Sequence, residues 1–190
     1  MKNNVAVVGW HANIDAMPLD TVEDMSKRLL YANSHETPDL ITSWFWEGRL
    51  DDEACAALLS AEWSGTDVLR YHRYDFLCMF DSATRSGPVT DDPTRIPQIL
   101  RKKKLRIYRG ACLAERNDEI GLSWTTDKTV ALGFLSDRFH QSSADPILLS
   151  AQVSPAECFG FFFERGESEV VVDPDILTDI TIEYRPRNVR

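Results

Sequence analysis

The sequence predicts an α+β protein: a helical N-terminal lobe, residues 1–104, and a β-rich core, residues 105–190, which together form one compact domain. Two observations favour this class. Apolar residues recur at helical spacing in the first half, and from Leu105 the chain changes to short alternating or wholly apolar runs. With 190 residues and 43% hydrophobic content, the chain is long enough to bury a sizeable core.

The lobe is expected to contain three main helices, each beginning at a residue that can cap it. The first follows Thr21, and the second starts near Asp51 or Asp52, whose charge suits a helix N-terminus. The third follows Thr66 or Asp67. Its aromatic residues are interpreted as core, and they include Tyr71, Tyr74, Phe76 and Phe80. A turn-rich connector and a short helix at 98–104 complete this half.

The second half is expected to be built from short strands and one helix. The helix starts after Thr126 and Asp127, and its buried side is predicted to carry Val130, Ala131, Phe134 and Leu135. The predicted strands cover residues 105–109, 121–125, 147–153, 170–172 and 180–184.

Charge and cysteine content exclude several function classes. The net charge of −9 argues against broad binding of nucleic acid or of an anionic membrane. The four cysteines and four histidines are scattered, so we expect no metal site and no disulfide framework, and a cytoplasmic protein. No stretch approaches the ~20 apolar residues of a membrane span. A basic run at residues 101–104 is either a solvated face or a surface for a phosphate-bearing ligand.

Two glutamates one residue apart, Glu167 and Glu169, stand between Gly166 and a run of three valines. On an extended strand, residues i and i+2 point to the same face, about 7 Å apart at the Cα. We therefore expect two carboxylates side by side at the end of a buried strand. Taken alone, such a pair is more typical of a solvated strand end.

Two further segments precede the glutamates. An arginine, Arg109, ends a predicted strand just before Gly110, and a hydroxyl-bearing strand, Ser123-Trp124-Thr125, leads into a helix. Each segment alone is ordinary, because most arginines before a glycine are surface residues. Their combination and order carry more information than any one of them.

Together, these three segments resemble the ADP-ribosyltransferases of the Arg–Ser–Glu class, in the toxin-like branch with a Glu-x-Glu motif. The resemblance covers roughly residues 105–185. It implies a catalytic core of two packed small sheets, preceded by accessory helices. It also implies NAD as substrate and no metal.

The resemblance assigns a role to each matching position. Arg109 would hold NAD through its phosphates, since a planar guanidinium suits bidentate contact with phosphate. Ser123 would position Glu169, the catalytic glutamate, which would hydrogen-bond the ribose 2′-hydroxyl. Glu167 would engage the acceptor nucleophile. The remaining residues of the same motifs, Gly110, Trp124 and Thr125, are assigned to the NAD site with them.

The chemistry suits these residue types. Loss of nicotinamide leaves an oxocarbenium-like ribose, which a nearby carboxylate stabilises. A second carboxylate can orient the acceptor or take its proton. Because two like charges repel at short distance, we expect one of the two glutamates to have a raised pKa.

The leading hypothesis is therefore a mono-ADP-ribosyltransferase acting on a macromolecule. A glutamate at position 167 favours a protein arginine as acceptor, whereas the basic run and exposed Trp124 or Phe161 would suit a nucleic-acid base. By family analogy, the protein would act as a toxin or phage-defence effector with an antitoxin or chaperone partner. The alternatives are an NAD glycohydrolase and a non-catalytic binding module on the same fold.

Overall fold

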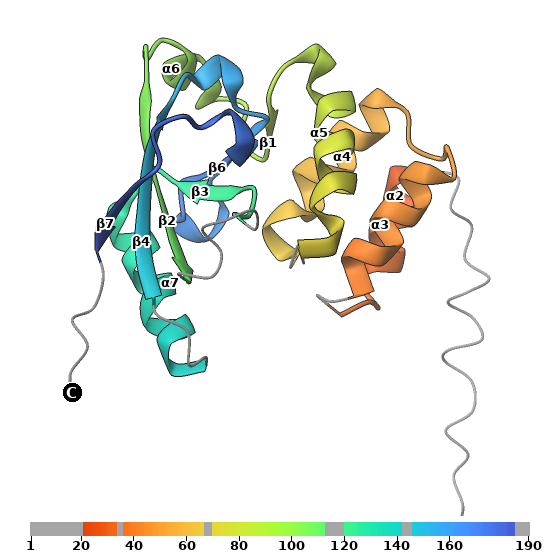
Figure 1. The fold of residues 1–190 in the computed structure, drawn as a ribbon. Coiled ribbons are helices and arrows are strands. Elements are labelled where there is room, and N and C mark those ends of the chain that lie inside the picture. Colours follow the sequence, from red (N-terminus) through yellow and green to blue (C-terminus); the bar gives the residue numbers. More distant parts are fainter. Residues whose placement is uncertain (1–20, 34–35, 67–69, 113–119, 142–145, 185–190) are drawn as a thin grey trace, which may run out of the picture.

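The computed structural model describes residues 21–33, 36–66, 70–112, 120–141 and 146–184. These residues form the predicted α+β architecture, in which a group of helices stands beside a twisted sheet (Figure 1). The helical group comes from the first half of the chain, and the sheet is built almost wholly from the second half.

Capping residues begin the lobe helices where the sequence places them. The Thr21 side chain accepts a hydrogen bond from the Asp24 N–H, and the Asp51 side chain accepts one from the Ala54 N–H. The described α-helices are α2 (Val22–Leu29), α3 (Glu36–Trp46), α4 (Asp52–Glu62), α5 (Arg73–Ala83), α6 (Ile96–Leu100) and α7 (Lys128–Gln141). None of these helices is long and apolar enough to cross a membrane.

Two of the lobe's helices differ from the prediction. Helix α3 is not among the three predicted lobe helices. The Asn33 side chain accepts a hydrogen bond from the Glu36 N–H and caps it, so the helix begins before Pro38. The third predicted helix is α5, which starts at Arg73 after a short 3₁₀ turn. The predicted caps at 66–67 do not begin it, and residues 67–69 lie outside the described residues.

The strands are hydrogen-bonded into one sheet of seven strands, in the order β1-β5-β6-β3-β2-β4-β7. The expectation of two packed small sheets is wrong for the described residues, because β2 pairs with β3 on one edge and with β4 on the other. All pairings are antiparallel except that of β1 with β5. The strands are β1 (Val89–Thr90), β2 (Leu105–Cys112), β3 (Ser123–Thr125), β4 (Pro146–Val153), β5 (Gly160–Phe162), β6 (Glu169–Val171) and β7 (Thr181–Tyr184).

Strand pairing is extensive between β2 and β4 and sparse between β2 and β3. Strand β2 pairs with β4 along its whole length, from Leu105 to Cys112. It pairs with β3 at a single position, where Tyr108 lies opposite Thr125. The strands that carry the predicted motifs therefore meet where the sheet is least tightly paired.

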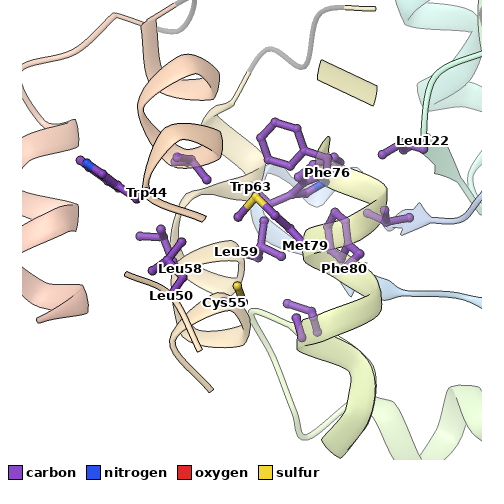
Figure 2. Close-up of a cluster of buried hydrophobic side chains, with 14 of the residues drawn as sticks. Trp44, Leu50, Cys55, Leu58, Leu59, Trp63, Phe76, Met79, Phe80 and Leu122 are labelled. Atoms are coloured by element: carbon purple, nitrogen blue, oxygen red, sulfur yellow. The ribbon is translucent and has the colours of Figure 1, made fainter. Parts of the chain in front are cut away.

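Alternation along the strands divides the core between the two faces of the sheet. In β6, Val171 joins the helical lobe's core, whereas Val170 packs into a second core on the opposite face. In β5, Phe162 and Phe161 divide in the same way. The lobe and the sheet thus share one hydrophobic core, part of which is drawn in Figure 2.

Some residues predicted to be buried are on the surface. Tyr71 and Tyr74 are 66% and 69% exposed, so the aromatic residues before and within α5 are only partly core. On α7, Phe134 is 44% exposed, although Ala131 and Leu135 are buried as predicted. The helix packs on the sheet through a narrower stripe than the apolar pattern indicates.

A polar cluster attaches β7 and α7 to β2. The Arg106 Nη2 and Lys128 Nζ atoms lie 2.6 Å and 2.5 Å from the two carboxylate oxygens of Glu183. Hydrogen bonds from these cations hold the pKa of Glu183 at about 2. The cluster belongs to the scaffold, and its Arg106 lies on β2, three residues before Arg109.

Candidate active site

The three motif segments lie on three neighbouring strands. In the sheet order, β6 is next to β3, and β3 is next to β2. Thr125 lies opposite Glu169 and Ser123 opposite Val171, while Tyr108, the residue before the predicted arginine, lies opposite Thr125. The fold therefore gathers segments that are widely separated in sequence.

Glu169 is a buried carboxylate with two donors on the same oxygen. The residue is 9% exposed at the start of β6. Its Oε1 accepts a hydrogen bond from the Ser123 hydroxyl and another, of 2.8 Å, from the Trp63 indole Nε1–H. Among the described residues, none donates to Oε2. Both hydrogen bonds that described residues donate to this carboxylate thus fall on Oε1.

Trp63 reaches this site from the helices of the lobe. It follows α4 at the lobe's border with the sheet and is 4% exposed. Its ring lies edge-on to Phe76 and Phe80, with ring centroids 5.6 Å and 4.8 Å away, in the cluster of Figure 2. The sequence analysis did not predict this role, because a tryptophan that follows an amphipathic helix is typical of a core residue.

The environment of Glu169 favours its protonated form more than water does. Burial raises the pKa of this carboxyl above its ordinary value, while hydrogen bonds from Ser123 and Trp63 oppose the rise. The negative charge of Glu167 raises the pKa further, and the positive charge of Arg109 lowers it. The raised pKa expected for one glutamate is therefore found at Glu169, with burial rather than like-charge repulsion as its main cause.

Arg109 lies next to the start of β3. Its Nη1 donates a hydrogen bond of 2.6 Å to the backbone carbonyl of Ser123. A Cβ at position 121 would lie 2.5 Å from Arg109 Nη2, so Gly121 leaves the space that the guanidinium occupies. The arginine is thereby held beside the residue that contacts Glu169.

Glu167 does not stand beside Glu169 on a strand, and that prediction is wrong. Strand β6 begins only at Glu169, and Glu167 has a helical backbone, with φ −80° and ψ −15°. The intervening Ser168 has a positive φ of 46°, as has Arg165 at 59°. Positive φ at two non-glycine residues is uncommon, so the sequence indicates only the turn at Gly166.

Thr125 fastens this turn to the sheet. Its hydroxyl donates a hydrogen bond of 2.5 Å to the carbonyl of Glu167 and accepts one from the Asp127 N–H at the start of α7. The Thr126 N–H donates to the carbonyl of Ser168. Thr125 is 5% exposed, and its side chain holds the glutamate turn. Its assignment to NAD stays a prediction.

Asp91 anchors the other side of the same turn. Its carboxylate accepts hydrogen bonds from the N–H groups of Phe163 and Glu164, each with a contact of 2.8 Å. Asp91 follows β1, which is paired to β5, so the two chain segments are already close. Sequence reasoning passed over Asp91 because an aspartate in a turn-rich connector is ordinary.

Two residues assigned to the NAD site are packed in the scaffold. Trp124 is 2% exposed in the second core, and at Gly110 a Cβ would lie 2.6 Å from the carbonyl oxygen of Ala131 in α7. Phe161 is 1% exposed, so the expectation of exposed rings at Trp124 and Phe161 is wrong. Strand alternation turns both rings away from the lobe. The NAD-binding roles of Trp124 and Gly110 stay predictions.

The basic run lies on the surface, as both of its interpretations require. All four residues at 101–104 are exposed, and they follow the short helix α6. At the start of that helix, the Arg95 guanidinium lies over the ring of Phe163, 4.6 Å from its centroid, and pairs with Asp92 at 3.1 Å. Within the described ranges, no group of histidine, cysteine and acidic residues is placed to hold a metal ion.

No family model, curated protein or solved structure matches this chain. The site is therefore interpreted from its own geometry and from the residues that occupy it.

Proposed function

We propose that this protein is a mono-ADP-ribosyltransferase that cleaves NAD and transfers ADP-ribose to a macromolecular acceptor. The observation that carries the proposal is the contact between the Ser123 hydroxyl and the Glu169 carboxylate, with Arg109 bonded to the carbonyl of the same serine. The motif resemblance assigns these roles to these three positions, and two hydrogen bonds link them across adjacent strands.

Glu169 would act on the ribose. Cleavage breaks the bond between C1′ of the ribose and the nicotinamide nitrogen, and the electron pair leaves with nicotinamide. The carboxylate stabilises the positive charge that develops on the ribose, and its Oε2 accepts a hydrogen bond from the 2′-hydroxyl. The acceptor nucleophile then bonds to C1′ and loses a proton, which passes to Glu167 or to water.

Arg109 would bind the pyrophosphate. Its guanidinium presents N–H donors in a fixed plane, a geometry that suits phosphate oxygens, and its Nη1 donates to the carbonyl of Ser123. A positive charge near Glu169 also lowers the pKa of that carboxyl. Arg109 therefore serves both substrate binding and the ionised state of the catalytic group.

The acceptor that we favour is a protein arginine. The burial of Trp124 and Phe161 removes the stacking surfaces that a nucleic-acid base would need there. Carboxylates at Glu164 and Glu167 flank the turn next to Glu169 and suit a cationic acceptor. A base acceptor is an outcome that the experiment below distinguishes.

The test is incubation of the purified protein with NAD labelled in its adenylate portion and a cell extract. We expect label on a macromolecule, lost on protease digestion but not on nuclease digestion, and absent with Glu169→Gln. Label confined to free ADP-ribose would instead identify a glycohydrolase. A Glu169→Gln variant that labels as well as the unchanged protein would refute the catalytic assignment, and absence of any NAD cleavage would favour a binding module.

Two variants test the division of roles. Ser123→Ala removes a hydrogen bond to a charged group, so NAD cleavage at neutral pH should fall by about 10- to 100-fold. Glu167→Gln should reduce transfer more than NAD hydrolysis, because Glu167 is proposed to act on the acceptor. Equal loss of both activities would contradict that assignment.

We also propose a toxin or phage-defence role, with an antitoxin or chaperone as partner, on family analogy. Such an activity consumes NAD and modifies macromolecules of the cell that holds it. Induced expression in a bacterial host should therefore arrest growth, and Glu169→Gln should relieve the arrest. Growth that is equally unaffected by both proteins would count against this setting.

A further inference from the structure

One hydrogen bond joins the helical lobe to the carboxylate of Glu169. The Trp63 Nε1–H donates to Oε1 over 2.8 Å, and both residues are more than nine-tenths buried. The two residues are 106 positions apart in sequence. A buried hydrogen bond to an ionised group is among the stronger single contacts, roughly twice a neutral one.

The position of Trp63 makes this bond rigid. The indole ring is fixed by Phe76 and Phe80 on α5 and by Phe162 on β5, whose centroid lies 6.2 Å away. The Ser123 hydroxyl can rotate, whereas the indole N–H points in one fixed direction. Trp63 therefore determines which oxygen of Glu169 is engaged by the protein.

We infer that Trp63 is a positioning residue for Glu169, which holds Oε1 of the carboxylate so that Oε2 faces the substrate. The role of Trp63 in the reaction rests on the proposed function. The hydrogen bond itself and its effect on the charge of Glu169 do not depend on that function. The helical lobe thereby becomes part of the catalytic unit.

The effect of the Trp63 hydrogen bond on the pKa of Glu169 can be separated from the effects of the other groups around this carboxyl. Among the residues that the structure describes, those that act on its ionisation are two donors, Ser123 and Trp63, and two charges, those of Glu167 and Arg109. Trp63 is the only one of the four that comes from the lobe. Phenylalanine at position 63 keeps most of the ring packing and removes the N–H, so the carboxylate loses a donor and protonates more readily.

The first measurement follows the indole N–H resonances of the full chain by NMR between pH 4 and 8. The protein has five tryptophans, and the resonance missing in Trp63→Phe is that of Trp63. We expect this resonance to titrate in a single step that disappears in Glu169→Gln. The resonance of Trp44, which is equally buried in the same core, should show no such step. No titration of the Trp63 resonance, or one that persists in Glu169→Gln, would overturn the inference.

The second measurement is the pH dependence of NAD cleavage. Trp63→Phe should lower kcat at pH 7 by about 10-fold or more, move the acidic limb of the profile to higher pH and change KM little. Trp44→Phe, a matched loss of one buried indole, should leave the profile unchanged. A loss that is equal at all pH values would indicate general destabilisation, and it would contradict the inference.

The two measurements separate the failures. If the Trp63 resonance titrates with Glu169 but NAD is not cleaved, the proposed function fails and the assignment of Trp63 to this carboxylate stands. If NAD is cleaved and Trp63→Phe keeps both the unchanged rate and the unchanged profile, the function stands and the positioning role is refuted.

Discussion

Replacing Glu169 by glutamine should stabilise the folded protein at neutral pH. Glutamine has nearly the same shape, and its amide oxygen can accept the hydrogen bonds from Ser123 and Trp63 that Oε1 accepts in the native protein. The replacement removes a carboxylate charge that is 9% exposed. Burial raises the pKa of Glu169 in spite of these bonds, so desolvation outweighs them when the group is ionised.

The expected gain is about 1 kcal/mol, the usual size of a single stabilising substitution. For a chain of this length it corresponds to a rise in Tm of about 2–4 °C. The raised folded-state pKa fixes the pH dependence. Stability from this group is fully present below the unfolded pKa and is lost as pH rises through the folded pKa. The Tm gain should therefore appear above that range and vanish near pH 4.

Thermal unfolding of the native protein and Glu169→Gln, measured from pH 4 to pH 8, checks this expectation. An exposed glutamate on α4, Glu53, provides the control, since Glu53→Gln should change the free energy of unfolding by at most about 0.5 kcal/mol. A Tm that falls in Glu169→Gln at neutral pH, or a difference independent of pH, would refute the account of this site as a desolvated carboxylate.

Three further outcomes follow from the structure. Gly121→Ala places a methyl group 2.5 Å from Arg109 Nη2 and should raise KM for NAD about 10-fold in steady-state assays, whereas Gly133→Ala in α7 meets nothing within 4 Å and should be harmless or stabilising; equal effects would contradict this. Asp91→Ala frees two N–H groups of the glutamate turn and should reduce transfer of label more than NAD cleavage, a difference that a purely structural role would not produce. Glu183 has a pKa of about 2 in the folded state, so it stabilises the protein at pH values above the ordinary carboxyl pKa of 4.5, and this stabilisation is lost as pH falls through the folded pKa. Glu183→Gln should therefore cost up to about 1 kcal/mol in denaturant unfolding at pH 7, and the cost should shrink steadily as the pH is lowered toward 2.

The strands of the site could be predicted from sequence because each carries its own local signal. The alternation around Ser123 and the valine run after Glu169 indicate strands without reference to the rest of the chain. The helix caps at Thr21 and Asp51 could be predicted equally well, since capping depends on neighbours within one turn. The fold class and the strands that carry the motifs can therefore be predicted from short segments of the sequence.

The remaining features depend on contacts between distant residues. Nothing near Trp63 distinguishes a tryptophan that donates to a carboxylate from one that only fills the core. The turn at Glu167 depends on a positive φ at Ser168, which tertiary contacts such as that from Thr125 hold in place. The side of the sheet on which Trp124 lies follows from the pairing register, which a three-residue strand specifies poorly.

Strand β1 has a consequence for how the chain can be divided. Its two residues, Val89 and Thr90, lie within the connector yet pair in parallel with Gly160 and Phe161 at the edge of the sheet. A fragment that began at residue 105 would leave that edge uncovered, with aromatic residues along it, and such edges recruit further strands. By covering this edge, the connector prevents the sheet from pairing with the sheet of a second copy of the chain. Insertions between the two halves are better tolerated in the exposed segment at 101–104 than before Thr90.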